Sequence, residues 1–267
     1  MTKAAKTLIV HPHGGLGNRM RVLVSSLEWA KNNNHRVLLI WEKNRVLNCD
    51  YERLFNKSPL IDRVVNIRIP ESIPSKLSKL LQMLRYPVLN DAILKGKPQN
   101  VSPYLQSRFF SPYVHSCYDF CSAPKLYQEH LVPISSIQTL VDSAPIMEEE
   151  LVGIHIRRGD NVMATSNSPT ALFIQAMRSE LESRPSCKFY LATDDASAQK
   201  EIQDVIGRET VYTREKNLSR NDAAGVVDAL IDILMLSRCR CIIGSFYSSF
   251  SDVASKYGNI PLQIMKQ

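Results

Sequence analysis

Residues 151–160 read Leu-Val-Gly-Ile-His-Ile-Arg-Arg-Gly-Asp. The first six form a short, mainly apolar run, which is typical of a buried strand. The run ends in two arginines and an aspartate. Ligands of open α/β sheets gather beyond the carboxyl ends of the strands. A strand that stops at paired arginines therefore predicts both a parallel α/β sheet and a ligand-binding edge.

The rest of the second half repeats strand and helix in alternation. The predicted strands are 151–156, 188–193, 210–212 and 241–244, and the predicted helices are 169–182, 196–206, 222–236 and 248–257. Alternating strands and helices favour a parallel sheet covered by helices.

The first half opens in the same way. An apolar run at 7–11 ends in a glycine-rich turn, and a helix is predicted from a cap at Asn18 to the asparagines at 32–34. Strands are predicted at 36–41 and 63–69. Nine of the 14 prolines lie between residues 70 and 145, and for this interval we predict only a helix near 76–85.

The sequence thus predicts an α/β protein made of two Rossmann-like units. We place them at 1–147 and 148–267, on either side of Glu148-Glu149-Glu150. The chain has 267 residues, of which 44% are hydrophobic and 22% charged, so it is neither disordered nor collagen-like.

The sequence offers neither a membrane segment nor a targeting signal. No run approaches the roughly 18–20 apolar residues of a membrane span, and residues 1–11 lack the apolar core of a signal peptide. We expect a protein without a membrane span that is cytoplasmic or otherwise soluble.

The net charge of +7 is uneven. Residues 1–147 hold 19 Lys and Arg against 10 Asp and Glu, and residues 148–267 hold 14 against 16. The basic residues are dispersed and no aromatic-basic motif accompanies them, so we expect a solvated basic face and no nucleic-acid partner. An acidic or phosphorylated small ligand is compatible with this charge.

The six cysteines are predicted to be buried free thiols. The pairs Cys117/Cys121 and Cys239/Cys241 have no second pair of His or Cys at zinc-site spacing.

The arginines at the end of strand 151–156 are the strongest chemical signal. Arg157 and Arg158 can grip a diphosphate and offset the charge that develops on a leaving phosphate. The alternative is a salt-bridge network with Asp160 and with Asp194-Asp195, which ends the next strand. Asp194 could also bind a ribose, a base or a metal ion, but no third carboxylate is placed for a metal.

Three further stretches suit a nucleotide. Asp232 lies in a nearly apolar helix and needs a partner, either a ligand N–H or an arginine. Four serines lie at 245–251, between a strand and a helix, where hydroxyls and free N–H groups can cradle a phosphate. Gly14-Gly15-Leu16-Gly17-Asn18 lies at an equivalent turn, although it is neither a dinucleotide fingerprint nor a P-loop.

These motifs, read in order, resemble the fucosyltransferase superfamily, which includes α1,2-, α1,6- and protein O-fucosyltransferases. The matching stretches are Gly14–Arg19, His155-x-Arg157-Arg158-x-Asp160, Thr193-Asp194-Asp195, Asp232-x-x-x-Leu236-Ser237 and Ser245–Ser251. The resemblance covers residues 151–257 and, locally, 8–30.

The resemblance implies a GT-B-like enzyme that transfers fucose from GDP-fucose to a glycan or glycoconjugate, inverts the anomeric centre and uses no metal or other cofactor. The first unit is then the acceptor side and the second binds the nucleotide sugar. Catalytic roles fall to Arg157, Arg158 and Asp160. The implied donor-binding residues are Gly15, Leu16, Gly17, Asn18, Arg19, His155, Arg157, Asp194, Asp232, Ser245, Ser248, Ser249 and Phe250, with His155 and Asp232 holding the guanine.

The chain departs from the family pattern in two respects. We expect no stem, anchor or accessory domain, and residues 161–167 hold no acid where α1,6-type enzymes place a glutamate as the candidate base. Deprotonation then falls to Asp160, or to a water or phosphate oxygen. Two alternatives stay open: another nucleotide sugar on the same scaffold, or a non-catalytic module that binds nucleotides or carbohydrates.

Overall fold

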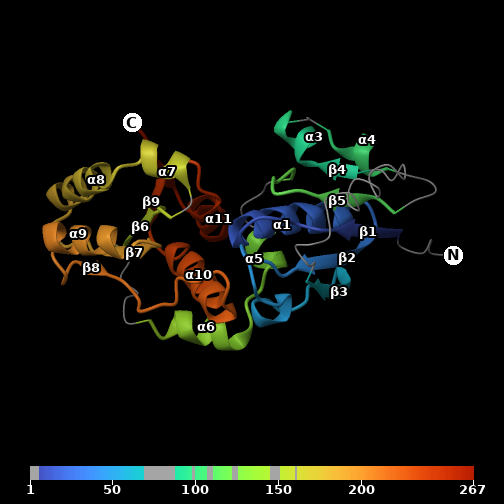
Figure 1. The fold of residues 1–267 in the computed structure, drawn as a ribbon, viewed down its shortest axis with the longest axis horizontal. Helices are drawn as coiled ribbons and strands as arrows, with labels where there is room; N and C mark the ends of the chain where they lie inside the picture. The colour runs from blue at the N-terminus through green and yellow to red at the C-terminus, as the bar shows by residue number, and fades with distance from the viewer. Residues whose placement is uncertain are drawn as a thin grey trace. The chain divides into compact units, whose positions relative to one another are not determined.

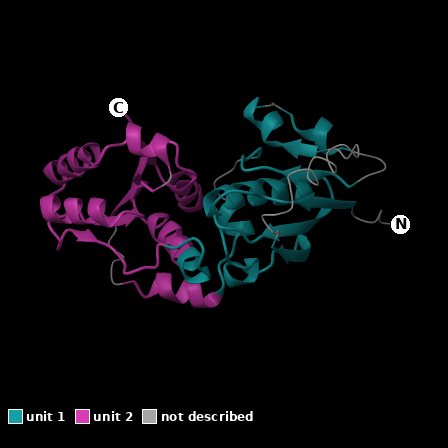
Figure 2. Ribbon diagram, viewed as in Figure 1, with its two compact units in different colours: residues 1–134, 219–227 teal, residues 135–218, 228–267 magenta. Residues whose placement is uncertain are grey.

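The computed structural model describes residues 6–68, 88–97, 100–106, 111–121, 126–144, 151–159 and 161–267. The chain forms two compact units (Figure 2). Unit 1 is Met1–Ile134 with Ser219–Val227, and unit 2 is Ser135–Leu218 with Asp228–Gln267. Each unit holds one five-stranded sheet, and every strand pairing in both sheets is parallel. The predicted fold class, two Rossmann-like α/β units, is confirmed.

The sheet of unit 1 has the order β3-β2-β1-β5-β4. Its strands are β1 Lys6–Val10, β2 His35–Glu42, β3 Ile61–Ile67, β4 Val88–Asn90 and β5 Tyr113–His115. Its helical segments are α1 Leu16–Asn32, η1 Tyr51–Arg53, α3 Asp91–Lys95, α4 Ser102–Leu105 and α5 Leu126–His130 (Figure 1). The turn after β1 therefore lies at the carboxyl edge of a five-stranded sheet.

The sheet of unit 2 has the order β10-β9-β6-β7-β8. Its strands are β6 Val152–Ile156, β7 Phe189–Thr193, β8 Val211–Tyr212, β9 Cys241–Ser245 and β10 Leu262–Met265. Its helices are α6 Ser135–Asp142, α7 Val162–Asn167, α8 Thr170–Ser183, α9 Ala196–Ile206, α11 Ser249–Gly258 and most of α10 Ala223–Leu236. The central strand β6 lies between β7 and β9, so its ends are flanked on both sides.

Side chains alternate across β6. Val152, Ile154 and Ile156 are fully buried in a core that also contains Phe173 of α8 and Ile202 of α9. The residues between them face the other side of the sheet. A Cβ built on Gly153 would lie 2.9 Å from Leu236 Cδ2, so a larger residue there would force the Leu236 side chain of α10 to shift. Helices therefore pack on both faces of this sheet.

The units divide after Ile134, which is earlier than the predicted division between 147 and 148. Helix α6 belongs to unit 2 because Arg238 pairs with Asp142 and donates to the Val141 carbonyl at 3.2 Å. A short return of the chain, 219–227, belongs to unit 1, where Asn48 donates to the Asn221 carbonyl at 2.8 Å. Neither contact is visible in composition or periodicity.

Most predicted elements of the second half agree with the structure within two residues, and α7 and β10 were not predicted. In the first half, α1 begins at Leu16 after an N-cap at Gly15, so the predicted cap at Asn18 is wrong. The helix ends at Asn32, as the asparagine run indicated. The predicted helix near 76–85 lies outside the described residues.

All six cysteines are free, as predicted. Cys49, Cys187 and Cys239 are buried, whereas the prediction of burial is wrong for Cys117, Cys121 and Cys241, which are half-buried. Within the described part of the chain, no helix combines the length and the apolar character needed to cross a bilayer.

Candidate functional site

The carboxyl ends of β6, β7 and β9 bring together the residues that the sequence singled out in unit 2. Arg157 follows β6, Asp194 follows β7, and Ser245 ends β9. The Arg157 backbone N–H donates to Ser245 Oγ at 2.9 Å, and the Arg158 N–H donates to Asp194 Oδ1 at 2.7 Å. The two neighbouring strands thus hold the backbone of both arginines in place.

The guanidinium group of Arg157 forms an ion pair with the other carboxylate oxygen of Asp194. The Arg157 side chain is only 13% exposed and that of Asp194 24%, so the pair is largely shielded from water. Gly159 completes this turn with a φ of +46°, and a Cβ there would lie 2.9 Å from Asp194 Oδ2. A glycine is therefore required where the chain passes the carboxylate.

Arg158 turns toward α8. Its guanidinium donates to the Arg157 carbonyl at 3.0 Å and to Thr170 Oγ1 at 3.1 Å. Burial lowers the pKa of Arg158, although Asp195 and Glu201 oppose this shift. Among the described residues, its side chain hydrogen-bonds to a carbonyl and a hydroxyl and forms no ion pair, so Arg158 is the arginine whose charge an anion could best complement.

The serine-rich loop joins β9 to α11. Ser245 is buried and also donates to the His155 carbonyl at 3.3 Å. Tyr247 has a left-handed backbone, and its side chain is largely exposed. Ser248 is the N-cap of α11, accepting a hydrogen bond from the Phe250 N–H, and Ser249 is the first helical residue. The predicted strand-to-helix geometry of this loop is present.

His155 stacks on Phe250, with ring centroids 4.7 Å apart and planes inclined by 16°. The ring is buried, and its Nδ1 has no hydrogen-bond partner among the described residues. Burial, with a smaller contribution from Arg157, lowers the pKa of His155 to about 3. His155 is therefore neutral at physiological pH, and it retains one unsatisfied buried nitrogen, which is costly without a ligand or water.

Asp232 has protein partners for both of its oxygens. Oδ1 accepts from the Tyr190 hydroxyl at 2.6 Å, and Oδ2 accepts from Lys216 Nζ at 2.6 Å, with Arg214 3.6 Å from Oδ1. Arg214 also pairs with Asp228, one turn earlier on α10. The partner that a buried Asp232 required is therefore supplied by the protein, and the assignment of Asp232 to guanine stays a prediction.

The glycine loop of unit 1 lies between β1 and α1. Leu16 and Gly17 are buried, while Gly15 and Asn18 are half-buried. Arg19 is fully buried: Nε donates to the Gly14 carbonyl at 2.8 Å, and the guanidinium also reaches the Glu42 carbonyl and lies over the Trp41 ring. Arg19 therefore braces the loop from within and has no exposed surface to offer a donor.

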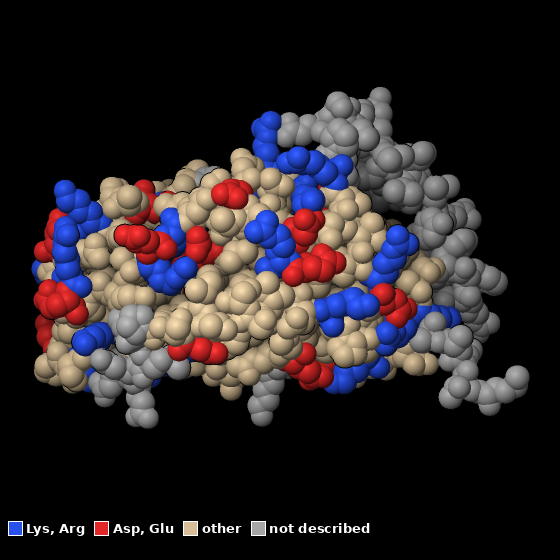
Figure 3. Space-filling view, turned by 90° about the horizontal axis from the view of Figure 1, so that it is seen from below, with Lys and Arg blue, Asp and Glu red and all other residues tan. Residues whose placement is uncertain are grey.

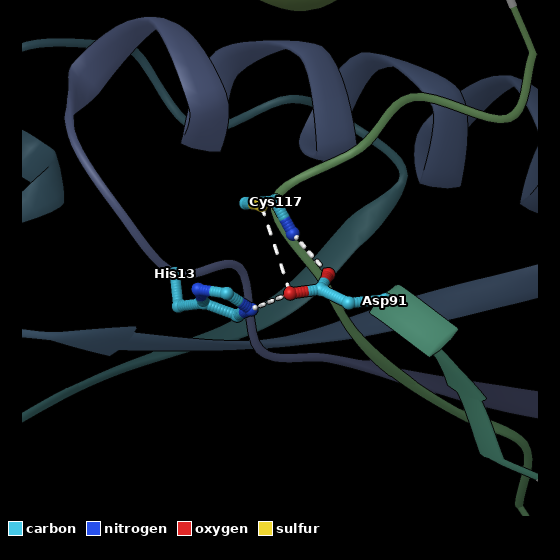
Figure 4. A group of neighbouring side chains, drawn as sticks. All are labelled: His13, Asp91 and Cys117. Atoms are coloured by element: carbon cyan, nitrogen blue, oxygen red, sulfur yellow. Dashed lines mark hydrogen bonds and ion pairs between the residues drawn. The ribbon is translucent and has the colours of Figure 1, made fainter. Parts of the chain in front are cut away.

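A cluster of histidines at the same edge of unit 1 was missed by the sequence analysis. His11 and His13 follow β1, His115 ends β5, and the ring of His115 lies 4.7 Å and 4.8 Å from those of His11 and His13. His13 Nε2 lies 3.0 Å from Asp91 Oδ2 (Figure 4). Asp91 and His115 come from the proline-rich interval for which no fold was predicted, so no sequence pattern linked them to His13.

Possible metal donors converge in this cluster. Nitrogen, oxygen and sulfur atoms of His13, Asp91 and Cys117 lie within 4.8 Å of one another, and within the described ranges no other such group occurs. Hydrogen bonds account for these contacts, since Cys117 donates to Asp91 through both its N–H and its thiol. Burial, followed by the charge of Asp91, raises the pKa of Cys117, which favours the thiol over a metal-binding thiolate.

The two aspartates after β7 have different partners. Asp194 pairs with Arg157, whereas Asp195 caps α9 by accepting from the Ala198 N–H at 2.7 Å. Asp160, the predicted catalytic acid, lies outside the described residues.

Comparison with known proteins identifies the fold. No protein-family model and no curated protein matches the chain. The α-1,6-fucosyltransferase NodZ from Bradyrhizobium aligns with 94% of this chain and 93% of its own, with a TM-score of 0.63 and 17% sequence identity. The chain has the fold of NodZ.

POFUT1 in its apo form shares this fold, over 99% of both chains, with a TM-score of 0.58 and 13% identity. NodZ has also been solved after soaking with GDP-fucose, and POFUT1 in complex with GDP-fucose. The likeness to these structures therefore covers nearly the whole length of the chain.

Proposed function

We propose that this chain is a fucosyltransferase that moves fucose from GDP-fucose to a hydroxyl of a glycan or glycoconjugate, with inversion at the anomeric carbon and without a metal ion. The observation that carries this proposal is the arginine turn after β6. Arg157 and Arg158 are fixed at a carboxyl sheet edge by Ser245 and Asp194. The NodZ-like fold and the GDP-fucose complexes of NodZ and POFUT1 support it.

In this proposal the diphosphate of the donor lies at the arginine turn. Arg158 and Arg157 stabilise the negative charge on the departing GDP, which is electrostatic stabilisation of the transition state. The N-terminus of α11, with Ser248 and Ser249, adds N–H and hydroxyl donors for a phosphate. These groups supply the positive field that a divalent ion provides in other transferases.

We place the nucleoside of GDP-fucose at the same sheet edge. The unsatisfied Nδ1 of His155 can form one hydrogen bond with the sugar nucleotide, and Phe250 fixes the plane of the imidazole ring. We also propose that the carboxylate of Asp232, which already accepts a hydrogen bond from Lys216, is the group that accepts hydrogen bonds from the guanine. In unit 1, Gly15, Leu16, Gly17 and Asn18 stay predicted donor-binding residues, and Arg19 holds their loop in shape.

Another nucleotide sugar is the second candidate, because one unsatisfied imidazole nitrogen does not by itself select guanine. The decisive measurement is the melting temperature with GDP and with UDP, since a ligand that binds only the native state stabilises it. We expect a shift with GDP alone. Turnover of GDP-fucose with a panel of glycan acceptors then separates an enzyme from a non-catalytic binding module.

A nucleic-acid partner is not proposed. On the face drawn in Figure 3, Lys and Arg lie next to Asp and Glu rather than in a continuous basic band. Lys31 pairs with Glu129 and Arg36 with Asp62 on exposed surfaces of unit 1, which neutralises part of its basic excess.

A further inference from the structure

Arg214 of unit 2 carries a buried donor for which the protein supplies no acceptor. The residue lies between β8 and α10, and its side chain is 19% exposed. Its Nη2 donates to Asp228 Oδ1 at 2.8 Å, whereas its Nη1 is buried and has no hydrogen-bond partner among the described residues. A buried N–H without an acceptor is costly, so we expect it to meet a ligand or a water molecule.

The direction of this guanidinium is fixed by α10. One oxygen of Asp228 accepts from Arg214, and the other accepts the Asn217 backbone N–H at 2.9 Å. The same carboxylate thus anchors the arginine and the segment that carries it. Because the guanidinium is rigid and planar, the ion pair to Asp228 also sets where Nη1 points.

The unsatisfied nitrogen lies beside the carboxylate of Asp232. Arg214 Nη1 is 3.6 Å from Asp232 Oδ1, which is too far for a hydrogen bond. Oδ1 accepts from the Tyr190 hydroxyl and Oδ2 from Lys216 Nζ, both at 2.6 Å. Each carboxylate oxygen can accept more than one hydrogen bond. The structure therefore places an unsatisfied donor next to an acceptor with spare capacity.

His155 lies on the same face of the sheet as this pair. Strands β6 and β7 are in register with His155 opposite Ala192 and Gly153 opposite Tyr190. His155 and Tyr190 are thus diagonal neighbours on the face that α10 covers. All of these residues belong to unit 2. The unsatisfied Nδ1 of His155 and the unsatisfied Nη1 of Arg214 therefore lie on one side of a single sheet.

The Arg214–Asp232 pair matches one edge of a guanine. That edge carries, side by side, an amine and the N1–H, which are donors, and the carbonyl O6, which is an acceptor. A carboxylate can accept from the two donors, and the carbonyl then needs an N–H next to that carboxylate. Resting on the proposed function, we infer that Arg214 is a base-binding residue whose Nη1 donates to O6, with Asp228 as its positioning residue.

The same arrangement disfavours other bases. Adenine carries an amine at position 6, which would set a donor against the donor of Arg214. Uracil has a carbonyl on each side of its N–H, so one of the two would meet the carboxylate of Asp232. Unpaired polar groups of this kind are how a site rejects a wrong ligand. Arg214 would therefore add selectivity for a 6-oxopurine that Asp232 and His155 alone do not provide.

The test pairs changes in the protein with changes in the base. The ligands are GDP, 6-thio-GDP, in which sulfur as a weak acceptor replaces O6, and IDP, which lacks the amine. The proteins are the full chain, Arg214→Met, Asp228→Asn and, as a matched control, Arg208→Met. Arg208 is an arginine of the same unit that pairs with Asp204 on the surface. Calorimetry gives each Kd, and urea unfolding shows which variants fold.

We expect the wild type to bind 6-thio-GDP about 10- to 100-fold more weakly than GDP, the range for one hydrogen bond from a charged donor. Arg214→Met should lose a similar factor in GDP affinity and should no longer distinguish the two ligands. It should still bind IDP more weakly than GDP, because the amine meets Asp232. Asp228→Asn should distinguish GDP from 6-thio-GDP less than the wild type does, and Arg208→Met should match the wild type.

Two results would overturn the role of Arg214 and leave the proposed function in place. One is a wild type that binds GDP and 6-thio-GDP equally well. The other is a folded Arg214→Met that keeps the wild-type preference for GDP over 6-thio-GDP. A wild type that binds no GDP, or binds UDP in its place, overturns the proposed function together with the inference. If Arg214→Met does not fold, the two ligands compared on the wild type and on Asp228→Asn decide the question.

Discussion

Arg157 and Asp194 meet across neighbouring parallel strands, the first just after β6 and the second just after β7. The same carboxylate also accepts the backbone N–H of Arg158 at 2.7 Å. One aspartate therefore sets both the direction of the first arginine and the backbone of the second, which explains how this turn holds two cations in a fixed arrangement.

We predict that Arg157→Ala loses turnover far more than stability. The arginine lies at a ligand edge rather than in the core, so its removal should cost about 2–4 kcal/mol of transition-state stabilisation, as for other strong charge-stabilising donors. The measurement is kcat/KM with GDP-fucose beside a urea unfolding curve. Arg208→Ala is the control and should leave both unchanged: this exposed arginine follows the end of α9 and pairs with Asp204. A near-normal rate in a folded Arg157→Ala would remove the arginine from the mechanism.

We also predict that activity survives chelation. The proposed positive field comes from Arg157, Arg158 and the N-terminus of α11. Asp194 already forms an ion pair with Arg157 and accepts the backbone N–H of Arg158. Initial rates are measured before and after dialysis against EDTA, with Mg²⁺ and Mn²⁺ added back. Two results together would place a metal at this edge. EDTA would have to abolish activity that Mg²⁺ or Mn²⁺ restores, and neither ion should restore it in Asp194→Asn.

The sequence predicted the second half of the fold well because its elements are local. Val152, Ile154 and Ile156 carry a strand pattern, and the helices after them end at clear breakers, so the arginine turn could be placed at a sheet edge. By contrast, the pairing of β5 with β1 joins residues about one hundred positions apart through an interval of nine prolines. Local patterns carry no information on that pairing.

The candidate site also combines residues that local patterns predict with residues that only long-range packing brings together. Arg157, Asp194 and Ser245 could be brought together because each follows or ends a predicted parallel strand. Arg19, however, was assigned to the donor by its place in a motif, and only the packing against Gly14 and Trp41 shows it inside the unit. The His13–Asp91 pair could not be predicted, since β4 and α3 lie in the interval without a pattern.

For Asp232 we predict a loss of stability on substitution. Asp232→Asn leaves Lys216, whose side chain is 6% exposed, without its carboxylate, and breaking a buried ion pair costs about 3–5 kcal/mol. Asp228→Asn is the control: its pair with Arg214 is 19% exposed on both sides, so the loss should be smaller. Urea unfolding measures both. Calorimetry with GDP on the folded variant tests the guanine assignment, which predicts weaker binding by about 1–3 kcal/mol; an unaltered Kd would confine Asp232 to the internal network.

Finally, His155 should make the protein less stable as the pH falls. Burial lowers its pKa to about 3 in the folded chain, against a usual value of 6.5, so between these values the unfolded chain binds a proton that the folded chain does not. The stability is therefore complete above pH 6.5 and declines as the pH falls toward 3. At pH 5 the cost for this one group amounts to about 2 kcal/mol.

The measurement is the free energy of unfolding of the wild type and of His155→Gln at pH 7 and pH 5. Because glutamine does not titrate, the variant should lose about 2 kcal/mol less than the wild type between the two pH values. The comparison cancels the contribution of His115, whose lowered pKa is common to both proteins. GDP, if it accepts from or donates to Nδ1 of His155, should steepen the difference further, since a bound ligand holds the imidazole neutral. If the unfolding free energies of the two proteins depend on pH in the same way, His155 binds a proton in the folded chain as readily as in the unfolded chain, and the prediction is wrong.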